Sequence, residues 1–292
     1  MHLMQTSTLR FSALCAAFGA VALVTVGCGG HNAASTSGTA TAATGAPSPS
    51  DSGTNALSSA EQAAGWRLLF DGKTTTGWRG FGKTSFPEKG WRAEDGILKH
   101  EKNEPGYHAG DIITDEEFGN FELVLDFRVT PRGNSGIKYL VDEKVAKSGA
   151  AVAFEYQILD DDLHPDATKG KDGDRKCGGL YDLIAPPSDK VLHPVGQWNQ
   201  ARLVVNGNHV EHWLNGKQTI AYERGSDDLK RRIAESKYKD VAGFGEASKG
   251  AHPFAGPQRR DRLPQHQGPD DQFGTLRGGR RFFSEPAAAP GV

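Results

Sequence analysis

The clearest pattern along the chain is an alternation of apolar and polar residues with a period of two, which is typical of strands half buried in a sheet. Residues 121–129 alternate except at Val124, so their apolar members share one face. Residues 153–159 alternate as well, and there Glu155 and Gln157 form the polar face. Both segments are therefore predicted to be strands with one side against a core.

Turn signals separate further strands. Glu94-Asp95-Gly96 and Asn206-Gly207-Asn208 each lie between two apolar runs and predict hairpins, and Asn215-Gly216 predicts another turn. Trp91 and Ile97-Leu98 lie on either side of the first turn, and the other expected strands are 66–70, 202–205, 209–214 and 218–222. Only 229–236 has a helical pattern. Many short strands with little helix predict an all-β fold, a β-sandwich or jelly roll, whose concave face often binds sugars.

The first 58 residues are predicted to lie outside this fold. An apolar run of 16 residues, 11–26, is too short for a membrane span but has the length of a signal-peptide core. It ends in Gly27-Cys28, which indicates lipoprotein processing: cleavage before Cys28 and lipidation of its thiol, although ordinary secretion is the alternative. Residues 29–58 lack Lys, Arg, Glu and aromatics, as expected of a flexible tether. Gly29 after the cysteine favours the outer membrane of a bacterial envelope.

Composition narrows the possible functions. The net charge of −2 shows no basic excess, so nucleic acid is not expected as a partner. Apart from Cys15 and Cys28, Cys177 is the sole cysteine, which rules out a disulfide within the domain. Because no histidine lies at a diagnostic spacing, Cys177 is expected to be a packed residue rather than a nucleophile. Residues 60–250 suffice for one domain with a full core.

Polar residues cluster after the strand that carries Glu155. Gln157 projects beside Glu155, and Asp160, Asp161, Asp162 and His164 follow directly. A carboxylate, an amide and an imidazole at one strand end can form a polar site, although an exposed sheet face with an acidic turn gives the same pattern. A retaining glycosidase needs two close carboxylates. Gln157 stands where the second would be needed.

Other candidates lie in glycine-rich segments. In Gly133-Asn134-Ser135-Gly136, Asn134 and Ser135 can hydrogen-bond sugar hydroxyls, or the segment is simply a tight turn. In 177–182, Tyr181 precedes Asp182, which can serve as a base, a metal ligand or a turn cap. His212 faces the opposite way from Glu211 and Trp213, and the pattern leaves open which set faces a site.

Several motifs in order resemble the 3-keto-disaccharide hydrolase family over residues 65–250. The motifs are Asp71-Gly72-Lys73 with Gly77-Trp78, Phe121-Glu122-Leu123, Gly133-Asn134-Ser135-Gly136-Ile137, Glu155-Tyr156-Gln157-Ile158-Leu159-Asp160, His164-Pro165, Gly179-Leu180-Tyr181-Asp182, Gly196-Gln197-Trp198-Asn199 and Glu211-His212-Trp213-Leu214-Asn215-Gly216. The resemblance implies a concanavalin-like or laminin-G-like β-sandwich that acts on 3-keto-glycosides.

The substrate implied by this resemblance suggests a mechanism. A ketone on sugar carbon 3 acidifies the hydrogen on carbon 2, so a base can remove it, the glycosidic oxygen leaves, and water adds back. The enolate needs a divalent metal or hydrogen-bond donors, and the sequence does not decide between them. Candidate bases or ligands are Glu155, Asp182 and His212. Candidate substrate-binding residues are Asn134, Ser135, Gln157, Asp160 and Tyr181. The alternative is a carbohydrate-binding sandwich without catalysis.

The C-terminal segment departs from the family pattern. Families of this kind close with a strand reading His-Ile-x-Leu-Gln-Asp-His and then Phe-Arg-Asn-Ile, whereas residues 251–292 contain six Arg and six Pro and no Ile. Read one base later, the codons for 251–267 can encode that missing ending. We therefore predict a one-base frameshift and an aberrant, disordered tail that supplies no strand. In such jelly rolls the first and last strands lie together, so 66–70 would lose its partner.

Overall fold

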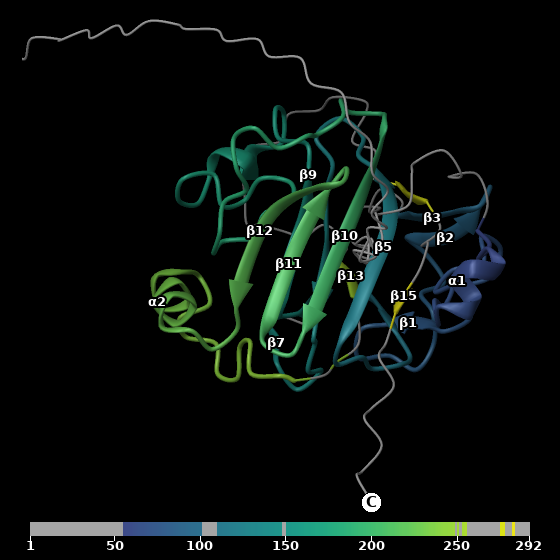
Figure 1. Ribbon diagram of the computed structural model, residues 1–292, viewed down its shortest axis with the longest axis horizontal. Helices are drawn as coiled ribbons and strands as arrows, with labels where there is room; N and C mark the ends of the chain where they lie inside the picture. Colours follow the sequence, from purple (N-terminus) through teal and green to yellow (C-terminus); the bar gives the residue numbers. More distant parts are fainter. Residues whose placement is uncertain are drawn as a thin grey trace, which may run out of the picture. The chain divides into compact units, whose positions relative to one another are not determined.

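The computed structural model describes residues 55–100, 110–147, 150–248, 250, 253–255, 275–277 and 282–283. Two antiparallel sheets pack face to face, and Figure 1 shows the larger one in front with β9 and β13 of the smaller one behind it. The fold is thus an all-β sandwich of the concanavalin-like kind, as the strand pattern predicts. No helix within the described ranges is long and apolar enough to cross a membrane.

The larger sheet has the order β12-β11-β10-β5-β14-β3-β2, with β15 also paired to β5. Strands β10 and β11 form the hairpin predicted around Asn206-Gly207-Asn208, and β2 and β3 form the one around Glu94-Asp95-Gly96. The strands are β2 Trp91–Glu94, β3 Ile97–His100, β5 Phe121–Arg128, β10 Trp198–Asn206, β11 His209–Leu214, β12 Lys217–Glu223, β14 Thr275–Arg277 and β15 Phe282–Phe283.

The smaller sheet has the order β1-β4-β13-β6-β9. Its strands are β1 Trp78–Gly80, β4 Ile112–Thr114, β6 Asn134–Tyr139, β9 Phe154–Leu159 and β13 Pro253–Ala255, and a separate pair is formed by β7 Ala146–Lys147 and β8 Ala150–Ala151. The helices are α1 Ser59–Ala63, the 3-10 helix η2 Pro165–Thr168 and α2 Asp227–Glu235. Helix α2 confirms the predicted helical segment 229–236. It lies at the edge of the molecule nearest β12 (Figure 1).

The core between the sheets follows from the period-two pattern. The alternate residues Phe121, Leu123, Leu125 and Phe127 of β5 are each at most 3% exposed. From the smaller sheet, Ile137, Tyr139, Phe154, Tyr156 and Ile158 belong to the same apolar cluster. The alternating apolar residues therefore place one full side of each of these strands in the core. Burial of each such side chain contributes about 1.5–3 kcal/mol, which makes it the main contribution to the stability of the fold.

The start of the domain differs from what the sequence predicts. Residues 66–70 form no named strand, and the Leu69 carbonyl accepts a hydrogen bond of 2.6 Å from the indole of Trp78 instead of a strand partner. The expected pairing of this segment with the last strand stays a prediction, because most of 251–292 lies outside the described residues. From 55 to 77 the structure has one helix, α1, whose capping box of Ser58 and Glu61 was not predicted, and a single β-bridge residue, Arg67.

The C-terminal segment contributes three short strands, so the prediction that it supplies none is wrong at those positions. Strand β13 lies in the middle of the smaller sheet, with Phe254 opposite both Ile112 and Ile137 and Ala255 opposite Gly136. Strands β14 and β15 pair with β5. The predicted signal segment, tether and Cys28 lie outside the described residues, as does most of 251–292, and the frameshift stays a prediction.

Candidate functional site

One face of the smaller sheet carries polar residues that are nevertheless buried. In the β6–β9 register Gly136 is opposite Gln157 and Lys138 is opposite Glu155, so these side chains share the face away from the core. All six residues of β9 are buried, and Gln157 and Lys138 are each 1% exposed. The alternative reading of Glu155 and Gln157 as an ordinary solvent-exposed sheet face is therefore wrong.

Glu155 is the most unusual group on this face. It is 7% exposed, and no described residue donates a hydrogen bond to its carboxylate. Removal from water raises the pKa of Glu155, opposed mainly by the positive charges of Lys138 and Lys237. The carboxylate lies over Gly136, where any Cβ would overlap it. Glycine at position 136 thus leaves room for the carboxylate. The interpretation of 133–136 as a turn did not predict this role.

A buried ion pair adjoins Glu155. The Lys138 ammonium lies 2.7 Å from the Asp111 carboxylate, and both side chains are 2% exposed. Asp111 also accepts a hydrogen bond of 3.3 Å from the Ala151 backbone. Removing one partner of a buried ion pair is strongly destabilising, so Asp111 holds the Lys138 side chain in place beside Glu155.

Asn134 and Gln157 lie together as predicted. The Gln157 side-chain amide donates to the Asn134 oxygen over 3.2 Å. Asn134 is the first residue of β6 rather than part of a turn, and it lies diagonally across from Gln157 on the face that carries Glu155. The remaining donors of the two amides are available for an adjacent ligand.

Tyr181 extends the site beyond the edge strand β9. Its backbone N–H donates to the Glu155 carbonyl over 3.0 Å. Because Leu180 bridges Tyr156 on the core side, Tyr181 lies on the same side as Glu155. Its hydroxyl donates to Asp166 over 2.6 Å, and the Lys237 ammonium lies 3.9 Å above its ring. The Tyr181 hydroxyl therefore donates its hydrogen bond to Asp166, and the Lys237 ammonium covers one face of its ring.

Asp182 is held by two donors. Its carboxylate accepts a hydrogen bond of 2.5 Å from the Arg175 guanidinium and one of 3.0 Å from the Lys237 backbone N–H. The φ of Asp182 is 63°, which is unusual for a residue other than glycine. Arg175 also contacts Asp166 over 3.0 Å. Asp182 was considered as a base, a metal ligand or a turn cap, and these contacts favour the turn cap. Its carboxylate anchors Lys237 and Arg175.

Two predicted substrate-binding residues are placed elsewhere. Ser135 pairs with Ile158 in the register, which puts it on the side of β6 opposite to Asn134. Asp160 is 2% exposed, and both of its oxygens accept backbone N–H groups, from Arg132 at 2.7 Å and from Asp162 and Leu163 at 3.1 Å each. The geometry therefore gives Asp160 a loop-stabilising role and separates Ser135 from the site.

His212 is also separated from Glu155. It is 0% exposed and lies between the sheets, where its Nε2 is 2.9 Å from the Tyr139 hydroxyl and its ring is 4.8 Å from that of Tyr156. Tyr156 is on the opposite side of β9 from Glu155, so the sheet stands between the two groups. Burial lowers the pKa of His212 to about 3, which keeps the imidazole neutral. The geometry assigns His212 to the core.

We expect this buried histidine to make the fold sensitive to acid. The pKa of His212 is about 3, and burial also lowers that of His100 to about 4, against 6.5 for both when unfolded. As the pH is lowered, these histidines therefore bind protons in the unfolded chain before they do so in the folded protein. Their contribution to the free energy of unfolding is complete above pH 6.5 and falls as the pH drops toward the folded pKa, by up to about 1.4 kcal/mol per pH unit for each group. Urea unfolding of His212→Gln between pH 6.5 and pH 4 should show a shallower decline. His193→Gln, at an exposed loop histidine, should keep the original slope; equal slopes for all three proteins would contradict the assignment.

The other candidate chemistry is limited. Cys177 is fully buried, and burial raises its pKa to about 12, so the thiol is not a nucleophile at neutral pH, as expected. Within the parts of the chain that the structure describes, no three His, Cys, Asp or Glu side chains come together in a way that holds a metal ion. Sequence reasoning missed Asp111, Lys138 and Lys237, which surround Glu155.

One face of this β-sandwich thus carries a buried acid, a buried lysine and paired amides, and a second lysine, Lys237, comes from the segment after α2. Residues 65–251 match the model of the 3-keto-alpha-glucoside-1,2-lyase-like domain, and the chain belongs to this family. The curated 3-keto-disaccharide hydrolase of Bacteroides thetaiotaomicron is 39% identical over 189 residues, which cover 60% of this chain and 64% of that protein. The chain therefore spans less than two thirds of the length of this relative.

Two crystal structures from Parabacteroides distasonis, both of glycosyl hydrolase candidates, share the fold. One is 29% identical with a TM-score of 0.64, covering 80% of this chain and 99% of that one. The other is 25% identical with a TM-score of 0.54, covering 75% and 99%. These similarities confirm the predicted family and the β-sandwich.

Proposed function

We propose that this chain cleaves the glycosidic bond of 3-keto-glycosides, with Glu155 as the base. The observation that carries the proposal is a carboxylate that is buried, has a raised pKa and accepts no hydrogen bond from any described residue. A base of this kind is poised to take a proton near neutral pH, because its proton affinity has been increased by desolvation. The family match supplies the substrate class.

The reaction runs in two halves. Glu155 removes the hydrogen on carbon 2, and the electron pair of that C–H bond forms an enolate with the carbon 3 ketone. As the enolate collapses, the bond from carbon 1 to the glycosidic oxygen breaks, and that oxygen takes a proton. Water then adds to carbon 1 of the enone and a proton returns to carbon 2, so the net reaction is hydrolysis. This route needs one base rather than two carboxylates, in agreement with Gln157 as the neighbour of Glu155.

The other residues of the face suit the charge that develops. Lys138 and Lys237 are the cations that act most strongly on Glu155. A positive charge near the base stabilises the negative charge of an enolate oxygen as well. Asn134 and Gln157 supply amide donors for sugar hydroxyls. Asp182 and Tyr181 act indirectly, since their contacts hold Lys237 in place.

The decisive experiment compares a 3-keto-glucoside with its unoxidised parent. The protein should release the leaving group from the former and leave the latter intact. In deuterated water, deuterium should enter carbon 2 of the recovered 3-keto sugar, which direct displacement at carbon 1 would not cause. Binding without turnover would instead favour the carbohydrate-binding alternative, and cleavage of the parent would reject the role of the ketone.

We also propose that Cys28 is lipidated and anchors the domain to the envelope membrane, an inference from the apolar run and the tether. Cells expressing the full chain with labelled palmitate should yield labelled protein in the membrane fraction. Cys28→Ser should lose the label and leave the membrane fraction, because a serine accepts no thioether lipid. Cys15→Ser, in the signal segment, serves as control and should keep the label. Equal labelling of all three chains would reject the anchor.

A further inference from the structure

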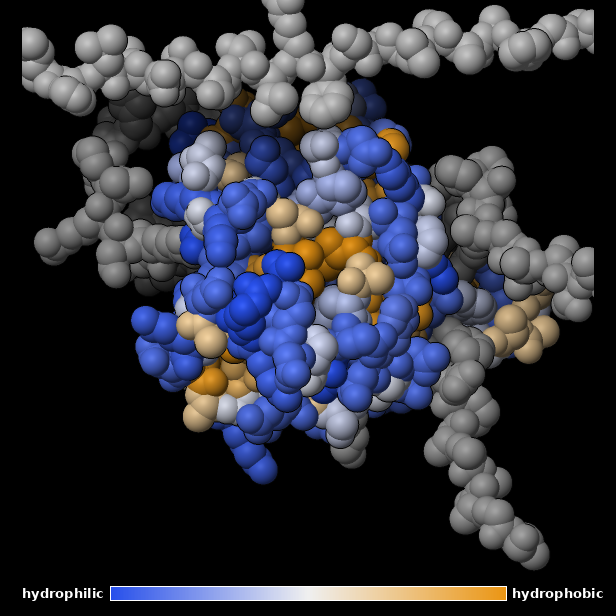
Figure 2. Space-filling model, turned by 60° about the vertical axis from the view of Figure 1, so that its left-hand side comes forward, coloured by the Kyte–Doolittle hydropathy of each residue, from blue (hydrophilic) through white to orange (hydrophobic). Residues whose placement is uncertain are grey.

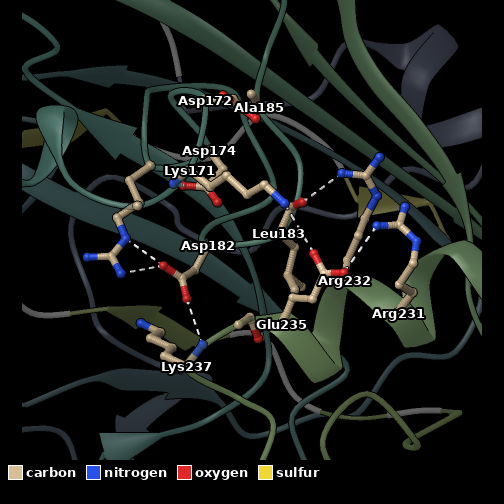
Figure 3. A pocket seen from close by; sticks show the side chains of 13 residues that line it. Lys171, Asp172, Asp174, Asp182, Leu183, Ala185, Arg231, Arg232, Glu235 and Lys237 are labelled. Carbon is tan, nitrogen blue, oxygen red and sulfur yellow. Dashed lines mark hydrogen bonds and ion pairs between the residues drawn. The ribbon is translucent and has the colours of Figure 1, made fainter.

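A pocket with a volume of about 460 Å³ opens beside the site, and apart from Lys237 and Asp182 its lining residues have no role in the mechanism above. It is formed by the loop 170–175, residues 182–185 and the C-terminal half of α2 with the residues after it. Figure 3 shows its charged side chains, with Asp182 pointing toward the backbone of Lys237. We propose that this pocket is the subsite for the leaving group of the substrate and that it takes a neutral polyhydroxylated residue, a second sugar. This inference rests on the proposed function.

Position is the first argument. Successive contacts connect the sheet with the pocket. The backbone N–H of Tyr181 donates to the carbonyl of Glu155 on β9, and the Lys237 ammonium lies over the Tyr181 ring. Lys237 lines the pocket, and its charge is among the largest influences on Glu155. A sugar ring at Glu155 therefore has its next bonded residue within reach of this pocket, past the edge of the sheet.

Charge and polarity select the kind of group. The lining has five cations and four anions, Lys171, Arg175, Arg231, Arg232 and Lys237 against Asp172, Asp174, Asp182 and Glu235. Several are paired with one another: Lys171 lies 3.2 Å and Arg231 3.6 Å from Glu235, and Arg175 bonds Asp182. A phosphate or carboxylate would meet cations that are already neutralised. A neutral polyol instead finds donors and acceptors of both kinds.

The apolar content of the pocket is small. Leu183 and Ala185 are its hydrophobic lining residues, and no aromatic ring lines it. The side of the molecule that carries α2 is mostly hydrophilic, with apolar areas near the middle and toward the lower left of the view (Figure 2). An aryl or alkyl leaving group would gain little from such walls, whereas a hydroxyl-rich ring replaces the hydrogen bonds it loses to water.

The test uses the full chain and two 3-keto substrates, a disaccharide and the corresponding methyl glycoside. The variants are Arg231→Ala, which removes a lining side chain, and Ala185→Trp, which fills the pocket. Lys230→Ala is the matched control, because Lys230 is a neighbouring exposed cation of α2 that does not line the pocket. The quantity measured is the ratio of kcat/KM for the disaccharide to that for the methyl glycoside.

Both pocket variants should lower this ratio about tenfold, the effect of losing one or two hydrogen bonds to the leaving sugar, and Lys230→Ala should not. An unchanged ratio in folded pocket variants overturns the subsite. If the unaltered chain turns over neither substrate, the proposed function fails, and calorimetric titration with the unoxidised disaccharide decides about the pocket. Binding that both pocket variants weaken then supports a sugar subsite, and equal binding or none overturns it.

Discussion

Replacing Glu155 by glutamine should lower the turnover of a 3-keto-glycoside by a factor of about 10² to 10⁴ while stabilising the folded protein at neutral pH. The loss of activity follows from removing the base. The gain in stability follows from desolvation: the folded pKa of Glu155 is raised above 4.5, so its contribution to stability is complete below pH 4.5 and is lost as the pH rises through the folded value. Above its folded pKa the carboxylate is a poorly solvated charge in the folded state, and glutamine removes that charge at almost constant volume.

The expected stabilisation is about 1–3 kcal/mol, the usual cost of a buried polar group without a partner. Urea unfolding at pH 7 and pH 4 measures it, and the difference between the two proteins should shrink at the lower pH. Glu211→Gln is the matched control, since Glu211 is a strand glutamate on the outer face of the larger sheet, bonded to the Trp213 indole. It should leave turnover unchanged. An active Glu155→Gln protein would reject Glu155 as base, and a variant that is less stable at pH 7 would reject the desolvated carboxylate.

The fold was largely predictable, because the signals that define it are local. Hairpins follow from short turn motifs such as Glu94-Asp95-Gly96, and the buried side of β5 follows from its alternating residues. The segment 66–70 failed because an apolar run has the same appearance whether its backbone joins a sheet or, as with Leu69, accepts a side-chain hydrogen bond. Pairings between distant segments, such as β13 with β4, leave no local trace.

The site was predictable only in part. Glu155 and Gln157 share a face for reasons of strand geometry alone, and Asn134 joins them. Alternation does not say which face meets the core, so His212 was grouped with Glu155 although a sheet separates them. Ser135 was grouped with Asn134 because Gly133-Asn134-Ser135-Gly136 resembled a turn, and in a strand neighbours point to opposite sides.

The lysines around Glu155 gave no signal at all in the sequence. A lysine such as Lys138 is expected at an exposed position of a strand, and its burial depends on Asp111, which directly precedes β4. Lys237 reaches the site because Asp182 fixes its backbone. Both depend on contacts between segments far apart in the chain, which single-sequence patterns do not contain.

Restoring the predicted reading frame from codon 251 should give a protein that is more stable and more active than the present chain. Strand β13 occupies the place between β4 and β6 with only three residues, of which Pro253 has no N–H to donate. The shifted reading His-Ile-Leu-Leu-Gln-Asp-His, started at 251, removes this proline and puts leucine at position 254, opposite Ile112 and Ile137 on the core side. It puts glutamine at position 255, opposite Gly136 and therefore on the face that carries Glu155.

Burying two or three more aliphatic side chains and completing the ladder is worth about 3–6 kcal/mol, which corresponds to a rise in Tm of at least about 6 °C for a domain of this size. Calorimetry and kcat/KM for a 3-keto-glycoside should be compared for the present chain, the frame-restored chain and a chain ending at Gly250. The shortened chain serves as control, because it separates the benefit of a new strand from the removal of an unfavourable tail. If the restored and the shortened chains melt together, the restored strand contributes nothing and the frameshift has no structural consequence. A higher Tm and kcat/KM in the restored chain alone would show that the middle of the smaller sheet, and with it the polar face around Glu155, is completed by the residues that the present frame replaces.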